Sequence, residues 1–196
     1  LVYNSQLVLD GPVHNALAHY LQNMLFLAGT TEQDSAELKT IRAEMYRGHT
    51  YIQSSDTTCL EIKTKDDVGI YFYVTHCPDV NYGPVTEIVT DKAVVTWVNT
   101  EKTKITWNDG RVEEFDNEGL DPYLEVFRLP AKKFRGEIDQ LPSTLENTRS
   151  FVLAVNGLYL SSKKVREIPA EYVKEFEEKG DLRTLVQDIV PLMDKA

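Results

Sequence analysis

The sequence has few of the features that mark several large classes of protein. Only two of its 196 residues are cysteines, Cys59 and Cys77, which excludes a disulfide framework. No apolar run approaches the roughly 20 residues that a membrane-spanning helix needs. The 10 glycines and 8 prolines are too few for a collagen-like or low-complexity chain. We expect both thiols to be reduced and half-buried, which fits a cytoplasmic protein.

Basic residues and phosphate-binding motifs are scarce as well. The 21 lysines and arginines are outnumbered by 31 aspartates and glutamates, so the net charge is −10. Such a surface repels phosphate backbones, and nucleic acid is therefore not an expected partner. Neither a G-x-G-x-x-G turn after a strand nor a P-loop occurs, so this chain cannot form a Rossmann domain. Its four histidines and two cysteines have no spacing that predicts a metal site.

The composition that remains is that of an ordinary globular protein. Hydrophobic residues make up 42% of the chain and charged residues 27%, and 196 residues are enough for a substantial core. No repeat or low-complexity linker divides the sequence, so we expect residues 1–196 to form a single domain. The chain begins at Leu1 without a signal-peptide pattern, and we expect it to be a processed product or part of a longer protein.

Hydrophobic periodicity predicts one helix, then many strands, then further helices. A short strand at residues 7–9 leads into Asp10-Gly11-Pro12, a helix-start signal, and helical spacing of apolar residues continues to Gly29. A hairpin turn is predicted at Asn108-Asp109-Gly110. The predicted strands cover residues 41–46, 57–64, 69–77, 85–89, 93–98, 103–107 and 111–115.

Helical periodicity returns from Leu120, with an interruption at Pro130. Residues 143–146 have a capping-box pattern that opens another helix, and residues 165–168 form a short strand. The tail from residue 170 to 195 is expected to form two helices broken at Gly180. This order predicts an α+β fold, a large and mostly antiparallel open sheet with helices packed on one face. Tyr71 and Tyr73 would lie on the opposite, open face.

The sharpest candidate for chemistry is the pair Asp10 and His14, at the predicted junction of strand and helix. An acid and an imidazole four residues apart can point into the same space there. The helix dipole would favour an ionised Asp10 and a neutral His14. A neutral imidazole can exchange a proton with a substrate hydroxyl. A structural role, with Asp10 as a helix cap, stays open.

Other histidines are weaker candidates. His19 lies on the predicted helix, and His76 ends a predicted strand with Asp56 nearly opposite it across the hairpin. Structural roles, as a hydrogen-bonded helix histidine and a cross-strand polar pair, are the alternatives. His49 is expected to be solvated in a loop.

Residues 9–29 resemble the start of the C-terminal domain of Gfo/Idh/MocA oxidoreductases. They read Leu-Asp-Gly-Pro-Val-His-Asn-Ala-Leu-Ala-His-Tyr-Leu-Gln-Asn-Met-Leu-Phe-Leu-Ala-Gly. The family pattern there is leucine, aspartate, three residues, histidine, and an amphipathic helix that ends in a small residue and glycine. Segments 43–47 with 56–60, 73–77 and 146–162 are similar to later parts of that domain, in the same order, so the resemblance covers most of the chain.

The resemblance implies that Asp10 and His14 are catalytic partners in hydride transfer between NAD or NADP and a sugar, polyol or related compound. It makes four residues candidates for substrate binding. These are His76, Asp56, His19 and Arg47.

The resemblance also implies partners for this chain. The family's N-terminal Rossmann domain holds the cofactor and a catalytic lysine in a Glu-Lys-Pro motif, and neither occurs here. We therefore expect no cofactor site in this chain and no turnover by it alone, with NAD or NADP bound by the full-length parent. The family's open sheet face usually packs against another subunit, which implies a homo-oligomer.

Two alternatives remain open on the sequence. One is a stand-alone binding or oligomerisation module without a catalytic partner. The other is a domain of an NAD-dependent glycosidase or lyase. Gly11-Pro12 differs from the commoner apolar-glycine pair of the family at these positions.

Overall fold

The computed structural model of the chain describes residues 2–3, 6–7, 9–31, 33–80, 83–98, 102–116, 119 and 121–196. The chain divides into two compact units. The first consists of Leu1–Asn81 and Pro142–Ala196, and the second of Tyr82–Leu141. Among the described residues, no helix is both long enough and apolar enough to cross a membrane.

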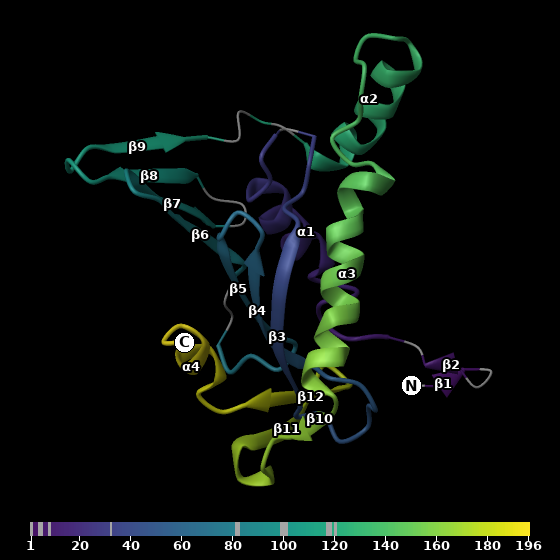
Figure 1. The fold of residues 1–196 in the computed structure, drawn as a ribbon. Helices are drawn as coiled ribbons and strands as arrows, with labels where there is room; N and C mark the ends of the chain where they lie inside the picture. The colour runs from purple at the N-terminus through teal and green to yellow at the C-terminus, as the bar shows by residue number, and fades with distance from the viewer. Residues whose placement is uncertain are drawn as a thin grey trace. The chain divides into compact units, whose positions relative to one another are not determined.

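A four-stranded sheet forms the centre of the first unit, in the order β10-β3-β4-β5 (Figure 1). Strands β3 (Leu38–Arg47), β4 (Thr57–Thr64) and β5 (Gly69–Thr75) pair antiparallel. Strand β10 (Val165–Glu167) adds to β3 in parallel. The sequence predicted β4 with its observed bounds and predicted β3 several residues too short.

One face of this sheet is covered by α1 (Ala18–Leu27) and α3 (Leu145–Ser162), which lie on the same side of it (Figure 1). The period-two alternation of the strands directs one row of each toward these helices, and that row is apolar. The α+β class and the helices on one face are therefore confirmed. The buried core residues are Val13, Leu21, Leu25, Met45, Leu60, Ile62, Ile70, Phe72, Val74, Ala154, Val155 and Leu158.

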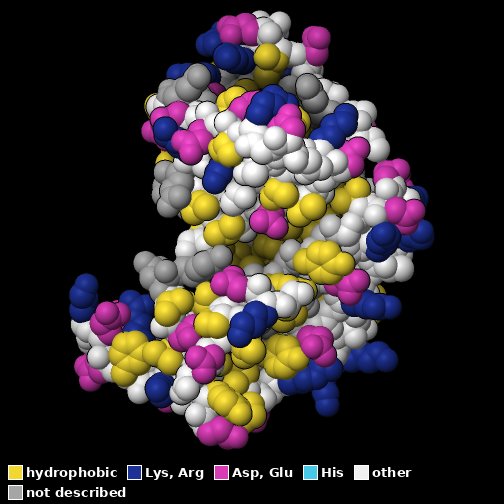
Figure 2. All heavy atoms as spheres, turned by 90° about the vertical axis from the view of Figure 1, so that its left-hand side faces the viewer, with side chains coloured by type: hydrophobic (Ala, Val, Ile, Leu, Met, Phe, Trp, Pro, Cys, Tyr) yellow, Lys and Arg dark blue, Asp and Glu magenta, His cyan; other side chains and the backbone are white. Residues whose placement is uncertain are grey.

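The opposite face of the sheet carries the predicted aromatic row. Tyr71 is 59% exposed, whereas Tyr73 and Cys59 are half-buried. Tyr46 donates a hydrogen bond of 2.7 Å to Glu44, and partial burial together with this carboxylate raises the pKa of Tyr46 to about 12. Figure 2 shows hydrophobic side chains interspersed with acidic and basic ones on one side of the molecule.

The start of α1 differs from the prediction. Residues 12–17 form successive turns, and the helix begins at Ala18 rather than beside Asp10. Pro12 supplies no N–H group, and its carbonyl oxygen accepts from the N–H of Leu17 at 3.0 Å, which is wider than a helical turn. The helix therefore has its positive end beyond His14, and the expected effect of its dipole on Asp10 and His14 is not supported.

The two ends of the first unit also differ from the prediction. Two short strands, β1 (Val2–Tyr3) and β2 (Gln6–Leu7), pair at the N-terminus. The strand predicted at residues 7–9 overlaps β2 at Leu7, and Val8 lies outside the described residues. Helix α3 is capped by Thr144, which accepts from the N–H of Asn147, one residue later than the capping-box pattern indicated.

The C-terminal tail is a hairpin rather than two helices. After η1 (Ala170–Tyr172), strands β11 (Val173–Glu178) and β12 (Asp181–Val186) pair along their whole length, and the short helix α4 (Ile189–Met193) follows. Lys179 and Gly180 join the strands with φ angles of 54° and 87°. Two successive positive φ angles define the tight turn that matches the twist of a hairpin, so Gly180 turns the chain where a helix break was expected.

The second unit contains a four-stranded antiparallel meander. Its strands are β6 (Val85–Val89), β7 (Ala93–Val98), β8 (Thr103–Trp107) and β9 (Val112–Phe115). The predicted turn at residues 108–110 is confirmed, with Gly110 at a φ of 89°.

The same unit contains helix α2 (Pro122–Phe134). It is capped by Asp121 and continues through Pro130, where an interruption was expected. Pro130 cannot donate the hydrogen bond that another residue would make there, and the helix nevertheless continues to Phe134.

The packing of α1 on the sheet gives a matched test of the core. Leu21 is 0% exposed, and Leu27 on the same helix is 52% exposed. Leu21→Ala is expected to lower the free energy of unfolding by about 2–5 kcal/mol, because it leaves a cavity that the core cannot close. Leu27→Ala should change it by about 0.5 kcal/mol or less. Urea denaturation measures both, and equal losses for the two variants would contradict the observed packing.

Candidate functional site

Asp10 is held at the start of the turn by contacts to its backbone. The Tyr159 hydroxyl donates to the carbonyl oxygen of Asp10 at 2.6 Å, and the Asp10 N–H lies 3.0 Å from the same hydroxyl oxygen. Ser54 also donates to the Asp10 carbonyl oxygen. Because Tyr159 belongs to α3, the core helix fixes where this turn begins.

Gly11 permits the close approach of this turn to the loop before β4. Its φ is 149°, a conformation that other residues rarely adopt. A Cβ atom at this position would lie 3.0 Å from Oγ of Ser55. The Gly11 N–H donates to Oδ1 of Asp10 at 2.8 Å. The Asp10 carboxylate therefore accepts from the next residue in the chain and does not cap helix α1.

His14 lies in the same turn and is half-buried. Its ring meets that of Tyr159 edge to face, with 5.3 Å between the centroids. Nε2 is shielded from solvent and has no hydrogen-bond partner among the described residues. Burial lowers the pKa of His14 below 6.5, and the nearby carboxylate of Asp10 partly offsets this. The neutral imidazole expected from the sequence is thus favoured, through burial instead of the helix dipole.

His76 lies within electrostatic reach of Asp10. Partial burial lowers the pKa of His76, and the carboxylates of Asp56 and Asp10 act in the opposite direction. The backbone N–H of His76 donates to the carbonyl oxygen of Asp56 at 2.8 Å, so the predicted cross-strand neighbours are confirmed. Asp10 therefore acts electrostatically on both His14 and His76.

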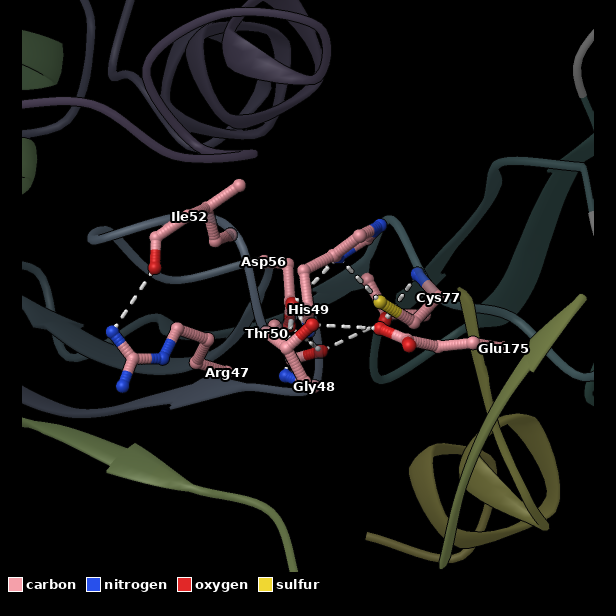
Figure 3. Close-up of polar contacts among 10 residues, drawn as sticks. Arg47, Gly48, His49, Thr50, Ile52, Asp56, Cys77 and Glu175 are labelled. Carbon is pink, nitrogen blue, oxygen red and sulfur yellow. Dashed lines mark hydrogen bonds and ion pairs between the residues drawn. The ribbon is translucent and has the colours of Figure 1, made fainter. Parts of the chain in front are cut away.

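The side chain of Asp56 lies in a buried cluster with His49 and Cys77 (Figure 3). Its Oδ2 atom lies 2.8 Å from Nδ1 of His49 and accepts from the backbone N–H groups of Gly48 and His49, both at 2.8 Å. Sγ of Cys77 lies 3.1 Å from the same Nδ1 atom. Burial and the Asp56 carboxylate raise the pKa of the Cys77 thiol, which disfavours a thiolate nucleophile.

The structure therefore corrects the expectation that His49 is solvated. Its side chain is only 15% exposed, because Asp56 accepts from both its ring and its backbone and draws the loop inward. The sequence around the start of β4 has no local pattern that predicts this contact. Only the pairing of β4 with β5 brings Cys77 near the loop that contains His49.

Arg47 and His19, which the sequence also predicted to bind the substrate, lie in less suitable positions. Arg47 donates to the carbonyl oxygen of Ile52 at 3.1 Å and forms an ion pair with Glu167, so its guanidinium is engaged within the fold. His19 is exposed on α1 and stacks at 4.2 Å on the ring of Tyr20. Neither contact joins them to Asp10 or His14.

The electrostatic link between Asp10 and His14 can be measured directly. We expect the pKa of His14 to lie below 6.5, and to fall further in Asp10→Asn because the carboxylate favours the protonated ring. Ring chemical shifts followed against pH report this value, with His14→Gln to assign the signal. Asp66→Asn, at an exposed turn, is the matched control and should leave it unchanged. An unchanged or higher pKa in Asp10→Asn would contradict the geometry.

The buried carboxylate of Asp56 is expected to contribute strongly to stability. Asp56→Asn places an amide N–H₂ group among backbone donors that now point at a carboxylate oxygen, and should cost about 3 kcal/mol of unfolding free energy. The exposed Asp66→Asn should change it by about 0.5 kcal/mol or less. Urea denaturation at pH 7 distinguishes them. A loss at Asp56 no larger than that at Asp66 would show that the cluster is not a stabilising element.

No protein-family model and no curated protein matches this sequence. Solved structures do match. UDP-N-acetylglucosamine 3-dehydrogenase GnnA from Acidithiobacillus ferrooxidans superposes with a TM-score of 0.63 at 12% identity, over 74% of this chain and 45% of that chain. For yvaA from Bacillus subtilis, named as a candidate oxidoreductase, the TM-score is 0.62 at 16% identity, over 83% and 52% of the two chains.

A third match is the WlbA dehydrogenase from Chromobacterium violaceum in complex with NADH and UDP-GlcNAcA. Its TM-score is 0.55 at 18% identity, over 79% of this chain and 44% of that chain. This chain thus spans about half the length of each structure. At these identities the likeness shows the fold alone, an α+β fold that this chain shares with about half of each of these oxidoreductases.

Proposed function

We propose that this chain is the substrate-binding C-terminal domain of an NAD(P)-dependent oxidoreductase that acts on a sugar, polyol or related compound. The proposal rests on the turn that contains Asp10 and His14. A buried imidazole nitrogen without a partner is costly in a folded protein and needs an explanation. Nε2 of His14 is such an atom among the described residues, and the carboxylate of Asp10 acts electrostatically on the same ring.

The chemistry that this turn can perform is the transfer of a hydroxyl proton. With its pKa lowered by burial, His14 is neutral at pH 7 and can accept a proton at Nε2. Asp10 would then stabilise the imidazolium that forms. Nε2 is covered in the structure, so the approach of a substrate hydroxyl also requires a rotation of the ring or a movement of what covers it. His76, within reach of Asp10, would bind a neighbouring hydroxyl of the same substrate.

The nicotinamide cofactor does not fit the residues of this chain. The sequence has no glycine-rich phosphate-binding turn, and its net charge of −10 disfavours a dinucleotide. A cofactor would have to be held by a Rossmann domain outside these 196 residues. This agrees with the length of the matched structures, of which this chain covers about half.

A sugar nucleotide is the substrate class that the comparisons favour. One matched structure is named as a UDP-N-acetylglucosamine 3-dehydrogenase, and another was solved with UDP-GlcNAcA. Vicinal hydroxyls of a sugar ring would suit two histidines that share one carboxylate.

The test uses the complete protein encoded by the reading frame that contains this sequence. It is assayed with NAD⁺ and NADP⁺ against sugars, polyols and UDP-sugars. His14→Asn is expected to lower kcat/KM by about 100- to 10,000-fold, because it removes the proton acceptor. Asn23→Ala, at an exposed position of α1, is the control and should retain the wild-type rate. Absence of dehydrogenase activity with every compound, or full activity of His14→Asn, would contradict the proposal.

A further inference from the structure

Three side chains of different chemistry meet at one end of the central sheet. His49 lies in the loop between β3 and β4, Asp56 directly precedes β4, and Cys77 follows β5 (Figure 3). Their ligand atoms Nδ1, Oδ2 and Sγ all lie within 4.8 Å of one another. The cluster is buried, with Cys77 at 0% exposure and the Asp56 side chain at 2%. None of the three belongs to the Asp10–His14 turn.

Two close contacts converge on one ring nitrogen of this cluster. Nδ1 of His49 lies 2.8 Å from Oδ2 of Asp56 and 3.1 Å from Sγ of Cys77. Without an ion, an Nδ1–H group donates to the carboxylate, and the Cys77 thiol is a second donor to Asp56. A cation placed among the three atoms would interact with all of them at once.

The surroundings of Asp56 orient its carboxylate as they would orient a metal ligand. Backbone N–H groups of Gly48 and His49 donate to Oδ2, and the Thr57 hydroxyl donates to Oδ1 at 3.0 Å. The Thr57 contact to Oδ1 is of the outer kind that fixes the direction of a ligating carboxylate. The two N–H groups on Oδ2 hold that oxygen in place, and an ion at Oδ2 would share it with them.

A catalytic triad is the other arrangement that these residue types make. In a triad, the nucleophile and the acid contact opposite nitrogens of the imidazole, so that the ring can pass on a proton. Here Cys77 and Asp56 contact the same atom, Nδ1 of His49. The geometry therefore does not support a relay from Cys77 through His49 to Asp56.

We propose that His49, Asp56 and Cys77 bind a zinc ion through Nδ1, Oδ2 and Sγ. Sulfur, nitrogen and carboxylate oxygen together suit Zn²⁺, whereas Mg²⁺ and Ca²⁺ require oxygen ligands. In a tetrahedral zinc site the ligand atoms lie about 3.3–3.6 Å apart, so the two contacts at Nδ1 need to open by about half an ångström. Oδ2 and Sγ lie within 4.8 Å of one another. No fourth His, Cys, Asp or Glu joins the three in the described part of the chain, so a water molecule would be the fourth ligand.

The ion would add a further link between segments that hydrogen bonds already join. It would connect the loop after β3 to the ends of β4 and β5. The carbonyl oxygen of Cys77 also accepts from the N–H of Val186, and a Cβ atom at Gly48 would lie 2.9 Å from the Val186 side chain. The C-terminal hairpin packs on the same place, so zinc binding should stabilise this end of the first unit.

The direct test is a cobalt titration of the tag-free protein after dialysis against a chelator. Co²⁺ replaces Zn²⁺ at tetrahedral sites and absorbs strongly when a thiolate coordinates it. We expect a thiolate-to-cobalt band that saturates at one ion per chain and is abolished by one equivalent of Zn²⁺. A wild-type protein that shows no such band overturns the proposal, whatever the variants do.

The two cysteines of the chain provide a matched control. Cys77→Ser should lose the cobalt band, whereas Cys59→Ser, on the open face of the sheet, should retain it. His49→Gln keeps the thiol and should weaken Zn²⁺ binding on the order of 100-fold, measured by competition with a chelating dye. If Cys77→Ser does not fold, the Zn²⁺ affinity of His49→Gln tests the proposed ligands instead. A band lost in Cys59→Ser and kept in Cys77→Ser, or unchanged affinity in His49→Gln, would contradict the proposed ligands.

Discussion

Helices α1 and α3 remove one face of the central sheet from water, and the position of the candidate site depends on this packing. Leu21, Leu25 and Leu158 are fully buried between helices and sheet, and burial of each such side chain contributes about 1.5–3 kcal/mol. Leu158 directly precedes Tyr159, whose hydroxyl holds the backbone of Asp10. The core therefore sets where the turn before α1 lies, and the chemistry of Asp10 and His14 follows from that position.

A second constraint is the buried carboxylate of Asp56. It draws the loop of Gly48 and His49 onto the sheet by accepting from their backbone N–H groups. Its own carbonyl oxygen pairs with the N–H of His76, which places that histidine within reach of Asp10. One residue thus organises the His49–Asp56–Cys77 cluster through its side chain and borders the Asp10–His14 turn through its backbone.

The sequence predicted most strands because their alternation is strong and their turns are short. The bounds of β4, β6, β7 and β8 agree with the prediction, and the apolar row of β4 and β5 is buried as expected. The prediction of two helices in the C-terminal tail was wrong. Its residues fit both the helical and the strand period, and the positive φ angles at Lys179 and Gly180 form the turn of a hairpin.

The candidate site was predictable only in part. Asp10 and His14 are close in sequence, so a local motif could identify them. The environment of His49 depends on long-range pairing of β4 with β5 and on a buried carboxylate, and neither has a local signature. The start of α1 was also predicted wrongly. A proline such as Pro12 is common at the first turn of a helix, but here a series of turns lies between it and the helix.

The central claim is that a substrate hydroxyl binds at His14. The most direct measurement is a crystal structure of the complete protein with a bound sugar or polyol substrate. The account predicts a substrate hydroxyl oxygen within hydrogen-bonding distance of Nε2 of His14, about 2.6–3.2 Å, with Asp10 beside the ring. A substrate bound elsewhere, with Nε2 still covered by protein, would contradict it.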